Sequence, residues 1–209
     1  MEKAILGKKV GMTQIFDKEG KAIPVTVVQV GPNIVIQKKT EETDGYNAIK
    51  VGFEDIKENK LIKPIRGQFE KVKLTTKRYI RELRLENVDS YEIGQEINAD
   101  VFVKGDRVDI SGISKGKGTA GIIKRYKTSR GPMSHGSHFH RAVGSIGASA
   151  SPGKTFKGQK LPGRMGNEKT TIQNIEIVEV NAEKNYILVK GGIPGIRGSL
   201  VMIKDTVKA

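Results

Sequence analysis

Residues 116–121 carry the first pattern in this sequence that could do chemistry. Gly116, Gly118 and Gly121 match the glycine spacing that holds the pyrophosphate of a dinucleotide, and they follow a strand-like run and precede a helix-like one. That fingerprint needs an acidic residue some twenty positions later for the ribose hydroxyls, and none occurs between residues 110 and 167. A dinucleotide-dependent enzyme that uses these three glycines therefore remains only an alternative hypothesis.

The same glycine-rich backbone is suited to another kind of phosphate. Free amides at the start of a helix favour an anion, and small residues let the anion approach closely. Four basic residues surround this segment, namely Lys115, Lys117, Lys124 and Arg125. A phosphate of an RNA backbone fits this setting better than a cofactor does.

Residues 147–155 resemble a nucleotide-binding P-loop but depart from it in two ways. Five residues separate Gly147 from Gly153, where the motif has four. No apolar strand precedes the segment, and Gly158, Pro162 and Gly163 interrupt the helix that would have to follow. We interpret the match as a coincidence in a glycine-rich stretch.

His135, His138 and His140 lie within six residues and could be considered as zinc ligands. No carboxylate or thiolate lies nearby to help hold a divalent cation, and Arg130 and Arg141 flank the group. The same lack of a local acid argues against a nucleophilic triad, although a triad partner can come from a distant part of the chain. We expect neither a metal site nor catalytic residues here, and assign the imidazoles to stacking or to hydrogen bonds with phosphates.

The segment that contains all these motifs has an unusual charge. Residues 110–167 form 58 positions without one Asp or Glu, and they hold eleven Lys or Arg, three His and twelve Gly. Residues 111–170 carry twelve basic and one acidic residue, so they account for +11 of the formal net charge of +14. With few large apolar groups, such a stretch repels itself and cannot offset the entropy lost on ordering. It therefore needs a polyanion, and a nucleic-acid backbone is the best candidate because each neutralised phosphate releases counterions.

We expect the basic side chains of this segment to bind phosphates, and its His and Phe side chains to contact bases or backbone oxygens. The predicted RNA-binding residues are Lys115, Lys117, Lys124, Arg125, Lys127, Arg130, His135, His138, Phe139, His140, Arg141, Lys154, Lys157, Lys160 and Arg164. The alternative is a disordered, solvated linker, since runs of charge are often no more than that.

Composition limits the class of protein. A chain of 209 residues is long enough for one domain with an appendage. It has no Cys, so neither disulfides nor thiolate metal sites are available, and a cytoplasmic location is expected. The first twelve residues lack the pattern of a signal peptide, and nowhere do eighteen apolar residues follow one another. We expect no membrane partner, no small-molecule substrate and no cofactor.

The rest of the chain has the pattern of short strands separated by turns. Strands are expected at residues 11–16, 22–30, 33–39, 46–53, 79–85, 96–102, 107–113, 171–180, 186–190 and 199–204, with a short helix at residues 69–74. Many short strands and few helices indicate a mainly β fold, a closed or nearly closed β-barrel. We expect this body to comprise residues 1–125 and 161–209. Residues 126–160 would form a long basic loop extension, whose arms of some 17 residues could each reach about 55 Å at full extension.

One set of spaced residues continues through the middle of the chain: Phe102, Asp109, Gly112, Ser114, Gly116, Lys117, Gly118, Gly121 and Arg125. With every spacing kept, this set resembles the pattern of the universal large-subunit ribosomal protein L3 family in its bacterial form. Further matches are residues 6–13, 144–147, 152–154, 156–158, 165–167 and 189–191, with Pro194-Gly195.

This resemblance implies a structural constituent of the large ribosomal subunit, with a β-barrel body and a loop that threads through ribosomal RNA toward the peptidyl transferase centre. It also implies direct binding of large-subunit ribosomal RNA, a role in early subunit assembly, and contacts with neighbouring ribosomal proteins. Some bacterial members carry a methylated Gln in the loop, and this position falls on Ala150, so that modification is expected to be absent. A non-specific RNA chaperone is the second alternative to this function.

Overall fold

The computed structural model describes residues 3–208. The strands are β1 (Ala4–Phe16), β2 (Ala22–Val30), β3 (Asn33–Lys39), β4 (Ala48–Asp55), β5 (Lys77–Leu83), β6 (Glu96–Ile97), β7 (Arg107–Ile113), β8 (Thr119–Ala120), β9 (Gly163–Arg164), β10 (Lys169–Asn181), β11 (Tyr186–Lys190) and β12 (Leu200–Asp205). The helices are α1 (Glu41–Asp44), α2 (Lys63–Val72) and α3 (Ile122–Tyr126), with 3₁₀ turns η1 (Glu58–Lys60) and η2 (Ala99–Val101). No helix in residues 3–208 has the length and apolar character needed to span a membrane.

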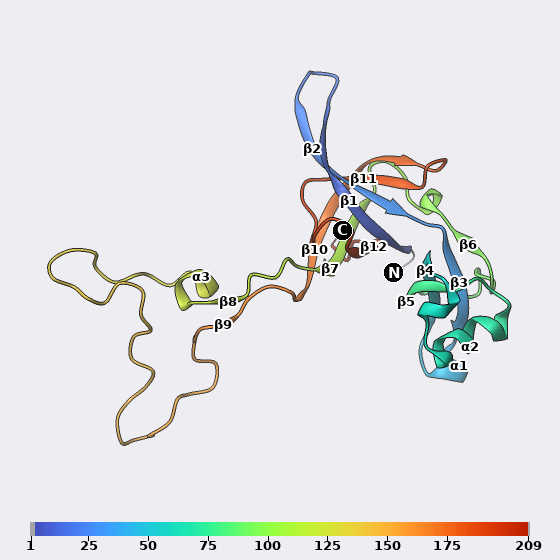
Figure 1. Ribbon diagram of the computed structural model, residues 1–209. Helices are drawn as coiled ribbons and strands as arrows, with labels where there is room; N and C mark the ends of the chain where they lie inside the picture. The colour runs from blue at the N-terminus through green and yellow to red at the C-terminus, as the bar shows by residue number, and fades with distance from the viewer. Residues whose placement is uncertain (1–2, 209) are drawn as a thin grey trace. The chain divides into compact units, whose positions relative to one another are not determined.

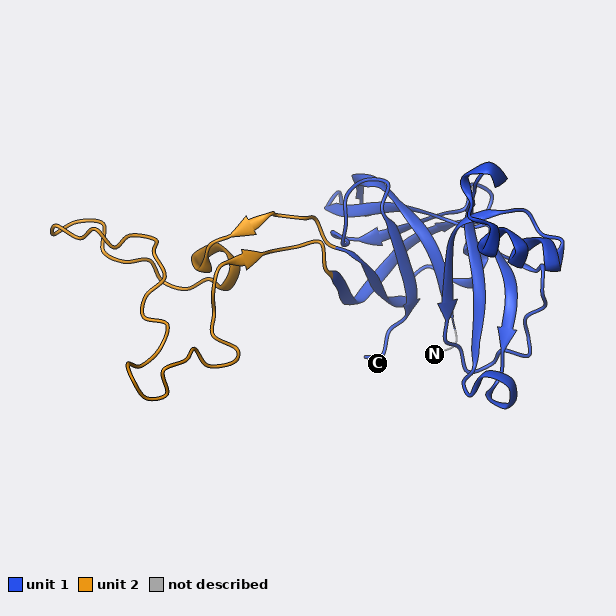
Figure 2. Cartoon of the chain, turned by 60° about the horizontal axis from the view of Figure 1, so that its bottom comes forward, with its two compact units in different colours: residues 1–113, 169–209 blue, residues 114–168 orange. Residues whose placement is uncertain are grey.

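The chain divides into two compact units, which Figure 2 shows in two colours. Unit 1 comprises residues 1–113 and 169–209, and unit 2 comprises residues 114–168. The expected loop, residues 126–160, falls within unit 2, together with β8, α3 and β9.

Six strands of unit 1 form a closed antiparallel barrel in the order β1-β12-β7-β10-β11-β2 (Figure 1). Strands β5, β4, β3 and β6 make a second antiparallel sheet. The mainly β fold with a closed barrel and few short helices is therefore confirmed. Closure of the barrel pairs β1 with β12, so the first and last strands of the chain are neighbours in the barrel.

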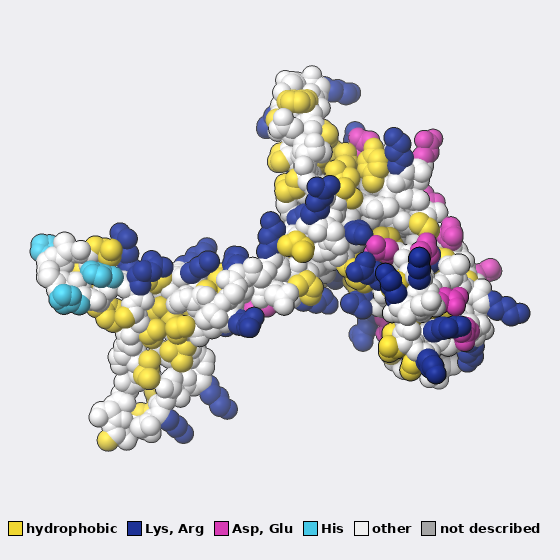
Figure 3. Space-filling model, in the orientation of Figure 1, with side chains coloured by type: hydrophobic (Ala, Val, Ile, Leu, Met, Phe, Trp, Pro, Cys, Tyr) yellow, Lys and Arg dark blue, Asp and Glu magenta, His cyan; other side chains and the backbone are white. Residues whose placement is uncertain are grey.

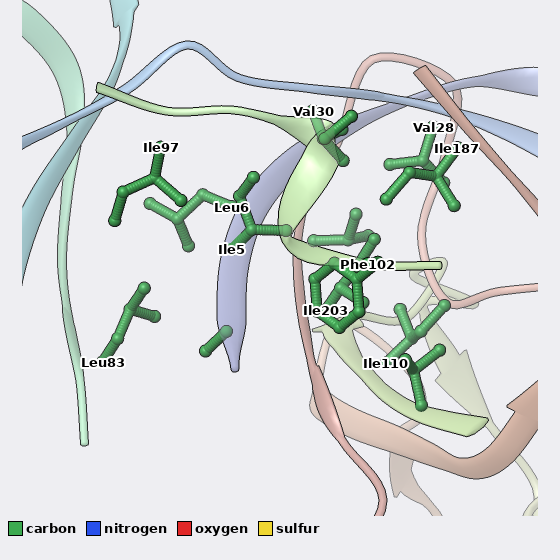
Figure 4. Packing of buried hydrophobic residues seen from close by; sticks show 14 of the residues in the cluster. Ile5, Leu6, Val28, Val30, Leu83, Ile97, Phe102, Ile110, Ile187 and Ile203 are labelled. Atoms are coloured by element: carbon green, nitrogen blue, oxygen red, sulfur yellow. The ribbon is translucent and has the colours of Figure 1, made fainter. Parts of the chain in front are cut away.

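One apolar core joins the barrel and the second sheet. Ile5, Ile110 and Ile203 from barrel strands are fully buried, and so is Ile49 from β4 (Figure 4 shows part of this cluster). In β7, Val108 and Ile110 point inward as their alternation predicts, because successive side chains of a strand face opposite sides. The barrel and the sheet thus share one hydrophobic interior.

Strand β1 begins at Ala4, seven residues before the expected start. Its first half pairs with β12 on one side, and Gly7 begins the pairing with β2 on the other. A Cβ at Gly7 would lie 2.7 Å from Val28 Cγ1, so only glycine fits at this crossing of strands. The pair Lys8-Lys9 hides the alternation in the sequence, yet Lys9 is buried and its Nζ donates to the carbonyl oxygen of Ile193 at 2.8 Å.

The expected strand at residues 96–102 is wrong over most of its length. Only Glu96–Ile97 pair as β6, and the chain then turns through η2. The amide of Phe102 donates to the carbonyl oxygen of Ala99 at 3.2 Å, and both side chains are buried. A 3₁₀ turn places residues three apart on one side, which is how both reach the core.

The helix predicted at residues 69–74 exists but begins earlier, at Lys63. Pro64 occupies the first turn, where its missing amide donor costs nothing. Phe69 is the buried residue of this helix and anchors it to the body.

Candidate nucleic-acid interface

The base of unit 2 is a two-stranded ribbon. Strands β8 and β9 pair through Thr119 with Arg164 and Ala120 with Gly163. Further backbone hydrogen bonds extend the ladder toward the ends of the unit, from the Lys117 amide to the Met165 carbonyl at 2.9 Å and from the Ser114 amide to the Glu168 carbonyl at 2.9 Å. The two arms of the unit are therefore held side by side along this ribbon (Figure 2).

Helix α3 follows the ribbon and ties the outgoing arm to the returning arm. The guanidinium Nη1 of Arg125 donates to the Leu161 carbonyl oxygen at 3.0 Å, and its Cζ lies 5.0 Å from the centre of the Tyr126 ring. Lys160 Nζ, from the returning arm, lies 5.9 Å from the same ring. A Cβ at Gly163 would approach the Arg125 guanidinium closely, so this glycine leaves room for it. Arg125 thus has a structural role inside unit 2 as well as its predicted role toward phosphate.

The three histidines lie on a closed turn. The Gly131 amide donates to the His140 carbonyl at 3.0 Å, and His140 Nδ1 donates to the Pro132 carbonyl at 2.9 Å. A Cβ at Gly131 would collide with the Phe139 carbonyl oxygen, so the turn requires glycine there. His135 and His138 are exposed on this turn. Within residues 3–208 no three His, Asp or Glu side chains come together as a metal-binding group.

The glycine fingerprint at residues 116–121 lies in a setting that does not suit a dinucleotide. The strand before the glycines, β7, pairs antiparallel with β10 and β12, and α3 after them has only five residues. Strand β8 lies within the pattern, between Gly118 and Gly121, and pairs antiparallel with β9. A dinucleotide site needs a parallel βαβ unit with a full helix behind the glycines. Residues 147–155 are exposed and border a shallow hollow of about 180 Å³, and no helix follows Thr155. Neither pattern has the frame that nucleotide binding requires.

The predicted RNA-binding residues are almost all accessible. Thirteen of the fifteen are exposed, and the other two, Arg125 and His140, are half-buried by the contacts just described. Figure 3 shows Lys and Arg side chains along the unit and the His side chains grouped at one end.

The basic side chains of unit 2 lack acidic partners. The unit holds eleven Lys or Arg and one acidic residue, Glu168, and in the described part of the chain no salt bridge involves any of the eleven. In unit 1, by contrast, Lys8 pairs with Glu54 at 2.8 Å and Lys77 with Asp55 at 2.7 Å. Within the described residues, the charge of unit 2 is therefore not neutralised by salt bridges inside the protein.

Comparison with known proteins decides the family. Residues 35–185 match the family model described as Ribosomal protein L3. The chain belongs to the ribosomal protein L3 family. A relative from Carboxydothermus hydrogenoformans, named Large ribosomal subunit protein uL3, is 57% identical over 208 residues, which cover 100% of this chain and 99% of the relative. The resemblance found in the sequence is therefore confirmed.

Membership of the L3 family makes this chain a structural protein of the large ribosomal subunit. It is a component of a ribonucleoprotein that takes part in translation, and its location is the cytoplasm. The L3 family has a structural role, so no reaction is assigned to the glycine or histidine motifs of unit 2.

Two basic residues of unit 1 that were not among the predicted RNA-binding residues border a hollow. Arg81 on β5 and Lys169 at the start of β10 are exposed and line the same hollow. Lys169 follows the basic segment directly, so the charge count included it. Arg81 gave no such signal, because it sits in an ordinary strand pattern far from Lys169 in the sequence.

Proposed function

We propose that this protein binds large-subunit ribosomal RNA directly through unit 2 and supports early assembly of the subunit. Residues 126–160 form the part that enters the folded RNA and extends toward the peptidyl transferase centre. The observation that carries this proposal concerns the charge of unit 2, which has eleven basic side chains and a single acidic residue. Within residues 3–208 none of these eleven basic side chains forms a salt bridge. The unit would be neutralised by a chain of phosphates.

The backbone of unit 2 supports the same proposal. From Thr128 to Pro162 it has no helix or strand, and nearly all its side chains are exposed. Such a segment has too little buried apolar area to offset its ordering entropy alone, so a partner must provide the contacts. Exposed His135, His138 and Phe139 offer flat surfaces on which unpaired bases can stack.

The partners that follow are large-subunit ribosomal RNA and neighbouring proteins of the subunit. Within unit 2, the side chains proposed to contact the RNA are the fifteen named above. The absence of a modified Gln at the position of Ala150 likewise stays a prediction.

Salt-dependent binding of the full chain to RNA tests the proposal. Affinity for a large-subunit ribosomal RNA transcript and for a small-subunit transcript of similar length is measured over a range of salt concentrations. Arg130→Ala and Lys154→Ala should each weaken binding and lower the slope of log affinity against log salt by about 1. Lys71→Ala is the matched control, because Lys71 is exposed on α2 of unit 1.

Two results would count against the proposal. If both unit 2 variants keep the wild-type salt slope, neither Arg130 nor Lys154 contacts a phosphate. Equal affinity for the two transcripts at moderate salt indicates a chaperone that binds through counterion release alone.

A further inference from the structure

Unit 1 contains a hollow that the proposed contact surface on unit 2 does not include. Its volume is about 380 Å³, near the lower end of the range for sites that bind small molecules. Residues from β7 and β12 of the barrel and from β5 of the second sheet line it. Leu6, Leu200 and Met202 make much of its wall apolar.

Two cations border this apolar wall without acidic partners. Arg81 and Lys169 are exposed, and no Asp or Glu lines the hollow. Among residues 3–208 neither side chain forms a salt bridge, whereas Lys77, also on β5, pairs with Asp55 at 2.7 Å. Glu82 follows Arg81 but faces the other side of the strand, where it binds Tyr46 and Lys39. Arg81 Nη1 donates to the Ile80 carbonyl oxygen at 2.8 Å, and its other guanidinium N–H groups remain for a ligand. An apolar hollow bordered by two cations without acidic partners is complementary to a ligand with an apolar body and a negative charge.

One wall of the hollow is aromatic and one offers a hydrogen-bond acceptor. Tyr79 lines the hollow, and the Arg78 guanidinium lies 5.2 Å from the centre of its ring, which helps hold the ring in place. Ser199 Oγ donates to the Ile196 carbonyl oxygen at 2.7 Å, so its lone pairs remain available to accept from an amino group. A nucleobase has both a flat apolar face and amino or imino donors at its edge.

We propose that this hollow binds an unstacked nucleotide of RNA, with the base against Tyr79 and the apolar wall and the phosphate on Arg81 and Lys169. The inference rests on the proposed function, since it adds a second RNA contact to the same protein. An acidic protein segment is the competing occupant, and RNA is favoured because each nucleotide carries a flat apolar base together with a phosphate. Base stacking on an aromatic side chain and a phosphate on a nearby cation are the usual elements of single-strand recognition.

Methionine methyl groups provide the test in the full-length protein. Met202 lines the hollow, whereas Met12 on β1 lies in unit 1 outside it and serves as the control that should not respond. Met133 in unit 2 reports RNA bound to the proposed contact surface of that unit. The ¹³C-methyl resonances are followed while hexa-adenylate RNA is added. Met202 should shift in a saturable way because the ring current of a bound base acts on its methyl group.

Removal of the two cations should weaken this response specifically. The double variant Arg81→Ala, Lys169→Ala should lower the salt slope of the Met202 response by about 1.4, the value for two contacts with a single strand. The matched control is the double variant Lys71→Ala, Lys184→Ala, which removes two exposed cations of unit 1 away from the hollow and should leave the response unchanged. A Met202 methyl that stays unshifted while Met133 responds, or a double variant with unaltered slope, overturns the inference.

Assembled subunits distinguish RNA from a protein occupant. Met202→p-benzoylphenylalanine places a photoreactive group in the hollow, and irradiation of large subunits that contain this variant should cross-link it to ribosomal RNA. A cross-link to another ribosomal protein overturns the inference. If the wild-type chain binds large-subunit RNA and only these tests fail, the second contact is wrong while the proposed function stands.

Discussion

Asp109 shows how one buried polar residue shapes the barrel. Its side chain is fully buried, and its Oδ1 accepts from the Asn174 amide at 3.0 Å. Asn174 has φ +58 and lies where the β7–β10 register shifts between Ile172 and Ile175. The carboxylate therefore satisfies an amide that the bulge removes from the ladder.

We predict that Asp109→Ala lowers the free energy of unfolding by about 1–3 kcal/mol, because the Asn174 amide loses the acceptor of a partly buried hydrogen bond. Urea unfolding of the full chain measures the change. Asn174→Gly is the control, since glycine adopts positive φ without cost and keeps the amide. A loss in the control as large as in Asp109→Ala would show that the bulge itself, not the hydrogen bond, is responsible.

A second prediction concerns Glu82 on the second sheet. The Tyr46 hydroxyl donates to Glu82 Oε2 at 2.9 Å and accepts from Lys39 Nζ at 2.8 Å. The hydrogen bond from Tyr46, followed by that from Lys39, lowers the pKa of Glu82 below its ordinary value of 4.5. A lowered carboxyl pKa stabilises the fold above pH 4.5, and this contribution is lost as the pH falls through the folded-state pKa.

Tyr46→Phe should raise the pKa of Glu82 toward its ordinary value, because it removes the largest cause of the shift. The phenyl ring keeps the cation–π contacts that Lys39 and Arg84 make with residue 46, each 5.1 Å from the ring centre. Carboxyl ¹³C titration by NMR in the wild type and the variant gives the answer. Identical titration curves would mean that the hydroxyl has no influence on the carboxylate.

At the scale of elements, the ribbon of unit 2 depends on close backbone packing. Gly166 has φ +72, and a Cβ there would collide with the Lys115 carbonyl oxygen on the facing arm. The neighbouring hydrogen bonds from Lys117 to Met165 and from Met165 to Gly118, each 2.9 Å, need that approach. The glycine is thus required both for its backbone angle and for its lack of a side chain.

We predict that Gly166→Ala opens the ribbon and speeds amide exchange at Lys117 and Met165, while barrel amides are unchanged. Gly158→Ala is a matched control, since Gly158 also has positive φ, +81, but has nothing within 4 Å of an added Cβ. Hydrogen exchange followed by NMR compares the two variants. Equal effects would assign the change to backbone strain alone.

At the scale of the whole molecule, the two units obtain order from different sources. Unit 1 has a closed barrel and a shared apolar core, so its own burial stabilises it. Unit 2 has the ribbon, one short helix and Ala120 as its buried hydrophobic residue among those described. We therefore expect most of its surface to become ordered through contacts with a partner.

We predict that amides of residues 128–160 exchange rapidly in the free protein, while those of β1, β7 and β12 are strongly protected. Addition of large-subunit ribosomal RNA should protect the same residues of unit 2, and addition of an unrelated RNA at moderate salt should not. Mass spectrometry of exchanged peptides distinguishes these states. Strong protection of residues 128–160 without RNA would contradict an RNA-dependent order.

Local patterns in the sequence were enough to locate several strands. The strands β2, β3, β7 and β11 have the predicted bounds. Their signals, the alternation of apolar and polar residues and the flanking turns, are local in the sequence. The charge of unit 2 was equally visible, since it depends on composition and not on fold. Tertiary contacts overrode the local pattern at Ala99 and Phe102, where a 3₁₀ turn buries both residues in place of a strand.

The β-rich character of the body and the position of the basic segment could both be inferred from local sequence, and the proposed polyanion partner follows from the charge of that segment. Three features required the folded chain to be seen: which strands close the barrel, which form a second sheet, and that Arg81 and Lys169 border one hollow. The physical reason is that side-chain alternation specifies the face of a strand but not its partner. Pairing and shared cavities depend on contacts between residues far apart in the chain, which local patterns do not record.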